Sequence, residues 1–305
     1  MRIKSLVGLA VIAPLLIATA QPVRLQPSSP WVLDYAENSC RLMRTFGEGS
    51  DKMQLLFESD APGEMDLVVV GRPLHGDSEE VPATFLPLES KPMKGRRAKT
   101  VGAGDPGVFW PEFLLLPQAE AEQVEKQEKE REAHPSVRPP PLNLAEVAAR
   151  KSRRQDFATK TTELQIEPRR GRHLILETGS LGAPIKMLDK CGRDSLRDWG
   201  VDPDLEDKIV RPVWAANPRQ WFSSADYPGL MLRIGEESDV SVRLLVDASG
   251  KVTKCTSLSH FEAPEFNQIV CDTFMKRAHF EPAETADGAK VPSYYTKRIR
   301  FQIAG

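Results

Sequence analysis

The sequence has little of several features that mark common protein classes. After residue 20 it has no apolar run near the ~20 residues that a membrane-spanning helix needs. Its 41 basic and 43 acidic residues are interspersed, which disfavours nucleic-acid binding and polybasic membrane attachment. Aromatic residues make up only 7% of the chain while prolines number 25, a balance that indicates some linker or irregular structure.

Signatures of catalysis are also missing. There is no Gly-x-Ser-x-Gly, no phosphate-binding Gly-Lys-Thr and no dinucleotide fingerprint. The tetrad Glu177-Thr178-Gly179-Ser180 resembles the Asp-Thr-Gly-Ser of aspartic proteases, but that catalysis needs two carboxyls sharing a proton. Here Glu177 replaces the required Asp and no second copy exists, so a strand-to-helix turn explains the tetrad more simply. The sequence predicts no enzyme and no cofactor; a hydrolase hidden in the N-terminal region is the alternative.

The first residues form an export signal. A basic start precedes the apolar run Leu6–Ile17, and the small residues Ala18-Thr19-Ala20 suit signal peptidase, so we expect cleavage near Ala20, before Gln21. The chain is then predicted to be periplasmic. In the alternative, residues 5–20 remain as an anchor in the inner membrane, and only then does the chain contact a membrane.

A length of 305 residues suggests roughly two domains. The first, residues 21–205, is predicted to be β-rich, because short apolar and alternating runs recur along it. We expect strands at residues 31–35, 40–46, 53–57, 65–70, 109–116, 164–166 and 174–176, and helices at 142–150 and 184–199. Between residues 72 and 107 the pattern fades, and the basic cluster Lys94-Gly95-Arg96-Arg97 is expected in a solvated loop.

A charged and proline-rich insertion is predicted near residues 117–141. Gln118–Ala133 carries pairs such as Glu122 with Lys126 at four-residue spacing, which support an exposed helix without an apolar face. The insertion is too short to cross a periplasm. Residues 206–225 are expected to form a linker, in which Trp214 and Trp221 pack between the two domains.

The last stretch, residues 226–305, has the order strand, tight turn, strand, helix, strand. Val240, Val242 and Leu244 alternate as in a half-buried strand, and Gly250 supplies the positive φ of a short hairpin. A second strand from Val252 and an amphipathic helix over residues 264–278 follow.

The chain closes with an alternating run from Tyr295 to Ile303. Its apolar residues Ile299, Phe301 and Ile303 are expected to face the core, while Arg298 and Arg300 face water.

This stretch resembles the C-terminal domain of the TonB energy-transducer family. The resemblance rests on Tyr227-Pro228, the strand 240–246, Asp247 with Gly250, Val252, the helix 266–275, the segment 280–283 and the closing Ile299-x-Phe301-x-Ile303. It implies an α+β fold in which a three-stranded antiparallel sheet packs on one helix. It also implies binding of the N-terminal box of outer-membrane transporters by strand addition. The receiving edge would be the last strand, with Tyr295, Lys297, Ile299, Phe301 and Ile303.

The four cysteines are an even set in a chain predicted to be exported, so disulfides are the default. Three pairings are possible. Cys255–Cys271 is favoured, because the second strand and the helix lie against each other in the proposed fold, and this leaves Cys40–Cys191. A metal site formed by Cys255, His260, Cys271 and His279 is disfavoured, since the spacing matches no familiar zinc pattern.

Together these observations predict a periplasmic TonB-like protein that binds envelope proteins by strand pairing in TonB-type transmembrane transport. A soluble adaptor or envelope-assembly module without coupling to the proton motor remains the alternative. The partner is expected to be a protein, and a homodimer is possible.

Overall fold

The computed structural model describes residues 21–76, 80–88, 90–101, 105–215, 218–258 and 264–303. The predicted signal segment and His260 lie outside these ranges. Within them, no helix is both long and apolar enough to cross a membrane.

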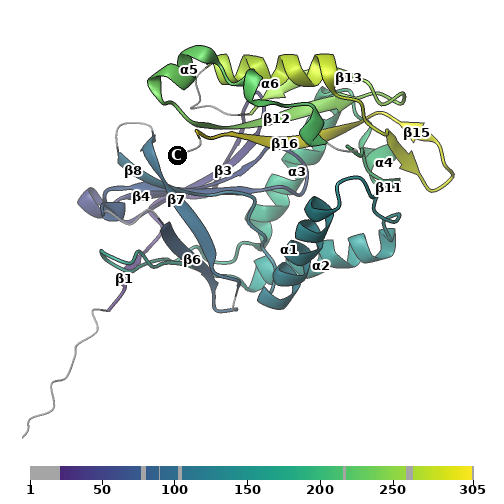
Figure 1. The fold of residues 1–305 in the computed structure, drawn as a ribbon. Helices are drawn as coiled ribbons and strands as arrows, with labels where there is room; N and C mark the ends of the chain where they lie inside the picture. The colour runs from purple at the N-terminus through teal and green to yellow at the C-terminus, as the bar shows by residue number, and fades with distance from the viewer. Residues whose placement is uncertain are drawn as a thin grey trace, which may run out of the picture.

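A ten-stranded, largely antiparallel sheet dominates the N-terminal unit (Figure 1), in the order β1-β10-β9-β6-β7-β8-β5-β4-β3-β2. Its strands are β1 Val23–Leu25, β2 Val32–Tyr35, β3 Cys40–Phe46, β4 Met53–Ser59, β5 Asp66–Gly71, β6 Glu80–Leu86, β7 Met93–Val101, β8 Asp105–Trp110, β9 Glu163–Ile166 and β10 Leu174–Leu176. Alternate residues of these strands are buried in one core, as for Leu42, Leu55 and Leu67. The strands predicted outside residues 72–116 are confirmed.

The prediction of a solvated loop at Lys94–Arg97 is wrong, because these residues lie on β7. Gly95 is the residue that packs inward: a Cβ there would lie 2.4 Å from Nε1 of Trp110. The indole N–H of Trp110 donates to the carbonyl of Val81 at 2.9 Å. A strand whose inward position is a glycine shows no hydrophobic alternation, so its period is invisible to a search for apolar residues. The run expected at residues 109–116 is a strand only as far as Trp110.

Three helices pack beside this sheet. The exposed helix of the insertion is confirmed as α1 Gln118–Ala133, while α2 Leu144–Lys160 is much longer than predicted. Helix α3 Gly182–Asp198 buries Ile185, Leu188 and Leu196 as expected. The disulfide Cys40–Cys191 joins β3 to α3.

The C-terminal unit contains a three-stranded antiparallel sheet in the order β13-β12-β16. Its strands are β12 Ser238–Val246, β13 Val252–Ser257 and β16 Ser293–Phe301, and helix α6 Pro264–Arg277 packs on it (Figure 1). The disulfide Cys255–Cys271 joins β13 to α6. The α+β fold and both disulfide pairings are thereby confirmed.

Shorter elements complete the unit and its approach. They are the helices α4 Pro203–Glu206 and α5 Gly229–Ile234, and a small sheet of β11 Ile209–Arg211, β14 Ala283–Thr285 and β15 Lys290–Val291. Single 3₁₀ turns occur at Gly49–Asp51, Arg72–Leu74, Pro218–Gln220 and Ser224–Asp226.

The expected packing of Trp221 between the domains is wrong, while that of the Trp214 side chain stays a prediction. Trp221 lies in the core of the C-terminal unit, with its ring 5.8 Å from that of Phe274 and 5.0 Å from that of Phe280. Trp214 pairs through its backbone with Glu281 of the same unit. The segment 206–225 is thus partly folded against the C-terminal sheet, and the domain boundaries given above stay predictions.

Gly250 is the turn residue that most restricts substitution. Its φ is +86°, and a Cβ at this position would lie 1.9 Å from the carbonyl oxygen of Phe280. We therefore expect Gly250→Ala to lower the free energy of unfolding by at least about 2 kcal/mol, as measured by urea denaturation. Gly288→Ala is the matched control, since Gly288 has φ +81° but open space around it. Equal losses in the two variants would contradict the role of the contact with Phe280.

Candidate functional site

Strand β16 forms one edge of the C-terminal sheet. It pairs with β12 along its whole length, from Ser238 opposite Phe301 to Val246 opposite Ser293. Among the described residues no strand pairs with its other side. Backbone N–H and C=O groups on an unpaired edge can accept an added strand.

The predicted site residues lie mostly on the side of β16 that faces α6. Phe301 is only 7% exposed, and its ring lies 4.9 Å from that of Phe266 and 5.5 Å from that of Tyr227. Ile299 packs against the same core. These side chains hold the strand in place, so the edge itself consists of backbone.

The remaining predicted residues flank this core. The ring of Tyr295 lies 4.9 Å from that of Phe280, and burial raises the pKa of Tyr295 to about 12. Lys297 is opposite Val242 in the register. Ile303 follows the strand, which ends two residues earlier than predicted, and its N–H donates to the Glu237 carboxylate at 2.8 Å.

The Tyr227-Pro228 pair begins a short helix at the end of the sheet. Pro228 is the N-cap of α5, and Gly235 ends this helix in the left-handed conformation. The hydroxyl of Tyr227 donates to the carbonyl of Glu236 at 2.6 Å. The pair therefore fixes the approach to β12.

The face of the sheet opposite α6 packs against the N-terminal unit, and the prediction that Arg298 faces water is wrong. The Arg298 side chain is 18% exposed, and its guanidinium pairs with Asp66 at 3.3 Å and lies over the Phe109 ring at 5.6 Å. Strand alternation gives the side of a residue but not what covers that side. Arg300 is about half exposed and pairs with Asp239 at 2.7 Å.

Arg243, on β12, is the most deeply buried cation of this contact, at 3% exposure. Its guanidinium donates to the backbone carbonyls of Asn38 at 3.0 Å and Asp60 at 2.8 Å. It also lies 3.5 Å from the ring centroid of Trp199, whose edge contacts Tyr294. Burial lowers the pKa of Arg243 to about 10, so the side chain stays charged near neutral pH.

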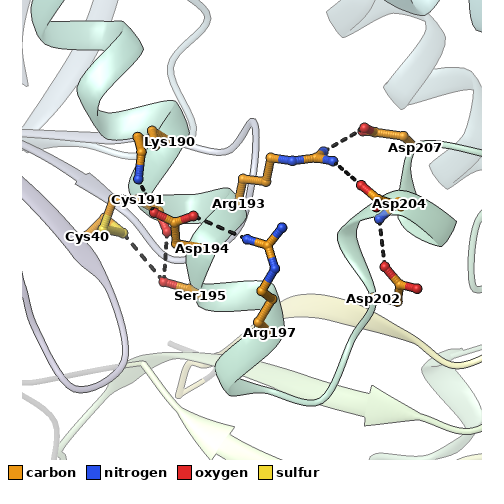
Figure 2. Close-up of polar contacts among 10 residues, drawn as sticks. All are labelled: Cys40, Lys190, Cys191, Arg193, Asp194, Ser195, Arg197, Asp202, Asp204 and Asp207. Atoms are coloured by element: carbon orange, nitrogen blue, oxygen red, sulfur yellow. Dashed lines mark hydrogen bonds and ion pairs between the residues drawn. A yellow bond between two sulfur atoms is a disulfide. The ribbon is translucent and has the colours of Figure 1, made fainter.

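Charged contacts run along the C-terminal half of α3, the helix that ends just before Trp199 (Figure 2). Arg193 reaches across to α4 and pairs with Asp204 at 2.8 Å and Asp207 at 2.6 Å. Asp194 pairs with Lys190 at 2.6 Å and with Arg197 at 3.3 Å on the surface of α3. The pairs of Arg193 fix α4, whose Glu206 accepts a hydrogen bond from Ser293 of β16 at 2.8 Å.

Three carboxyls of the segment 60–66 face the C-terminal sheet. Burial is the main cause that raises their pKa values, to about 8 for Asp60 and in the same direction for Glu64 and Asp66. The hydroxyl of Thr296 donates to Glu64 at 2.6 Å. The contact therefore sets the partly buried Asp60 and Asp66 and the more exposed Glu64 of one unit against Arg243 and Arg298 of the other.

The insertion also contacts the C-terminal unit. Arg138, 18% exposed, pairs with Glu281 at 2.6 Å and Glu284 at 3.3 Å, and it donates to the carbonyl of Pro282 at 3.2 Å. The N–H of Leu142 donates to the carbonyl of Val210 at 2.6 Å. The proline-rich segment is thus a strap from α1 to the small sheet.

The tetrad at Glu177 has the geometry of a turn. Glu177 pairs with Arg24 at 2.6 Å, which holds the pKa of its carboxyl below the usual range. Ser180 donates to the carbonyl of Thr159 at 2.8 Å, just before α3 begins. The strand-to-helix turn predicted for these residues is confirmed.

The described residues contain no group of three or more His, Cys, Asp and Glu side chains placed to hold a metal ion. Cys255 and Cys271 are joined to each other, and His279 is exposed. A hollow of about 600 Å³ lies between α1, α2 and α3, but Arg154 and Arg193 in its lining are paired with Asp189 and Asp207. Both arginines are therefore engaged in ion pairs within the protein.

Sequence reasoning missed the inter-unit residues. Trp199 is the last residue before a helix-ending glycine, and nothing in that position indicates a distant arginine above its ring. Arg243 lies between the buried Val242 and Leu244, so the sequence predicts that its side chain points to the opposite face of the strand. The sequence does not predict that the N-terminal unit covers that face.

The C-terminal unit is an α+β domain with an antiparallel three-stranded sheet, one covering helix and an open strand edge. Residues 223–303 match the family described as Gram-negative bacterial TonB protein C-terminal, and this segment is therefore a TonB-type domain. Domains of that family are non-enzymatic, take part in envelope transport and interact with outer-membrane proteins. No curated protein matches the chain.

Proposed function

We propose that this protein is a periplasmic TonB-like component of transmembrane transport that binds an envelope protein by strand pairing at the outer edge of β16. The partner of that edge would be an extended N-terminal segment of an outer-membrane transporter. The observation that carries the proposal is that β16 pairs with β12 on one side and, in the part of the chain that the structure describes, with nothing on the other.

The geometry supports pairing through the backbone. Phe301 and Ile299 are packed in the core and keep β16 extended, so the strand is rigid before a partner arrives. A preformed edge avoids the entropy cost of ordering the receiving strand. Specificity would come from the alternate side chains of the incoming segment.

Cysteine cross-linking tests this proposal. The four native cysteines form two disulfides, so an introduced cysteine is the only free thiol. We expect Lys297→Cys on β16 to form mixed disulfides with a cysteine-scanned synthetic peptide from the N-terminal segment of an outer-membrane transporter. The yield should alternate with every second peptide position, because side chains of a strand alternate between faces.

Thr253→Cys is the matched control, because Thr253 is an exposed residue on β13, the other edge of the same sheet. The β16 variant should give at least about tenfold more product than this control. Equal yields at both edges, or no alternation along the peptide, would argue against pairing at β16.

A further inference from the structure

We propose that the N-terminal unit regulates this strand edge through a proton-sensitive contact, in which the segment 60–66 holds Arg243 and Arg298 in acid and loosens its hold as the pH rises. The regulatory role rests on the proposed function, but the contact and its pH dependence do not.

The contact reaches both β12 and β16, the strands that form and support the edge. Arg243 is anchored from β12 on the carbonyls of Asn38 and Asp60. Arg298 is anchored from β16 on Asp66 at 3.3 Å, and Thr296 on Glu64 at 2.6 Å. Any loosening of segment 60–66 therefore acts directly on the strand that offers its backbone.

Asp60 is a group whose ionisation in the closed contact is costly. Its Oδ1 atom is buried and has no hydrogen-bond partner in the described part of the chain. An ionised oxygen in such a place lacks the hydration that it would have in water, so the neutral acid is favoured. Arg243 favours ionisation of Asp60, and its guanidinium donates to the backbone carbonyl of Asp60.

Further acids surround Asp60 on the side of the N-terminal unit. Glu58 of β4, Glu64 and Asp66 all disfavour a negative charge on it. Glu58 is itself paired with Arg41 at 2.8 Å.

Acidic neighbours also disfavour ionisation around Asp66 and β16. Glu112, after β8, opposes ionisation of Asp66 and of Glu64, while Arg298 favours it. On the side of α4, burial raises the pKa of Glu206, and Tyr294 has a raised pKa for the same reason. The acids thus outnumber the two arginines that face them from the C-terminal sheet.

The sign of the pH dependence follows from these shifts. An exposed carboxyl titrates near pH 4, whereas Asp60 in the closed contact titrates near 8, and Glu64 and Asp66 are shifted in the same direction. The closed state therefore holds protons that an open state releases. The contact is at full strength below about pH 4 and weakens as the pH rises toward about 8. Arg243, with a pKa of about 10, stays charged throughout this window.

Hydrogen exchange of the full chain without any partner tests the contact. After correction for intrinsic exchange, amides of residues 293–298 should exchange at least about tenfold faster at about pH 8.5 than at about pH 5.5. Asp60→Asn keeps the shape of the neutral acid and removes its titration, so this variant should lose most of the increase. Asp272→Asn, on the exposed surface of α6, is the control and should behave as the wild type.

A wild-type profile that does not change with pH, or an Asp60→Asn profile equal to that of the wild type, overturns the proposal. Cross-linking at Lys297→Cys remains informative in either case. If peptide capture fails while the exchange profile shifts as expected, the proposed function is wrong and the contact is right.

Discussion

Arg243→Ala is expected to lower the free energy of unfolding by about 3–5 kcal/mol, because it removes two buried hydrogen bonds from a charged donor, each contributing about 1.5–3 kcal/mol. The loss leaves the carbonyls of Asn38 and Asp60 without their donor and removes the cation above the Trp199 ring. Chemical denaturation followed by circular dichroism measures the change. Hydrogen exchange of residues 293–298 should rise at the same time.

Arg300→Ala is the matched control on the neighbouring strand. Its side chain is half exposed and pairs with Asp239 at 2.7 Å, and exposed ion pairs contribute about 0–1 kcal/mol. Similar losses for the two variants would mean that the arginine on β12 does not anchor the C-terminal unit.

Removal of the disulfide Cys40–Cys191 by a double change to alanine is expected to cost about 5 kcal/mol, by the loop-entropy relation for a closure of this length. The cross-link spans 151 positions and joins β3 to α3, so it limits the unfolded chain over most of the N-terminal unit. Denaturant unfolding of the oxidised protein, compared with the double variant, measures the effect.

The second disulfide provides the comparison. Cys255–Cys271 spans 16 positions, and its removal should cost about 3 kcal/mol by the same relation. If the short cross-link proves the more stabilising of the two, loop closure is not the dominant contribution of these bonds.

The C-terminal fold was predictable because local signals agree along it. Val240, Val242 and Leu244 alternate, Gly250 provides the turn, and a helix-period stripe with Phe266 and Phe274 follows. Each strand and the helix thus showed its own hydrophobic periodicity, and the order of these elements was enough to predict the sheet and its covering helix.

The middle of the large sheet was not predictable in the same way. On β7 the inward position is Gly95, and charged residues lie on either side of it. Apolar periodicity cannot mark a strand whose inward side is a glycine packed under Trp110. Helix α2 was underestimated for a related reason, since most of its residues are exposed and only Phe157 and Ala158 are buried.

The sequence predicts the edge strand β16 but not the contact between the C-terminal sheet and the N-terminal unit. The position of β16 at the end of the sheet follows from strand order, and the structure moves its ends by two residues. The pairing of Arg243 with Trp199 and Asn38 joins residues that are far apart in the chain. Nothing local to any of them indicates the others, so only the three-dimensional structure reveals the contact.

Neither disulfide crosses from one unit to the other: Cys40–Cys191 lies within the first and Cys255–Cys271 within the second. A mechanical pull exerted on β16 by a tethered partner would therefore pass to the N-terminal unit through noncovalent contacts and the polypeptide chain, and through no cross-link. The noncovalent contact between the two units, together with the strap at Arg138, would bear that tension first.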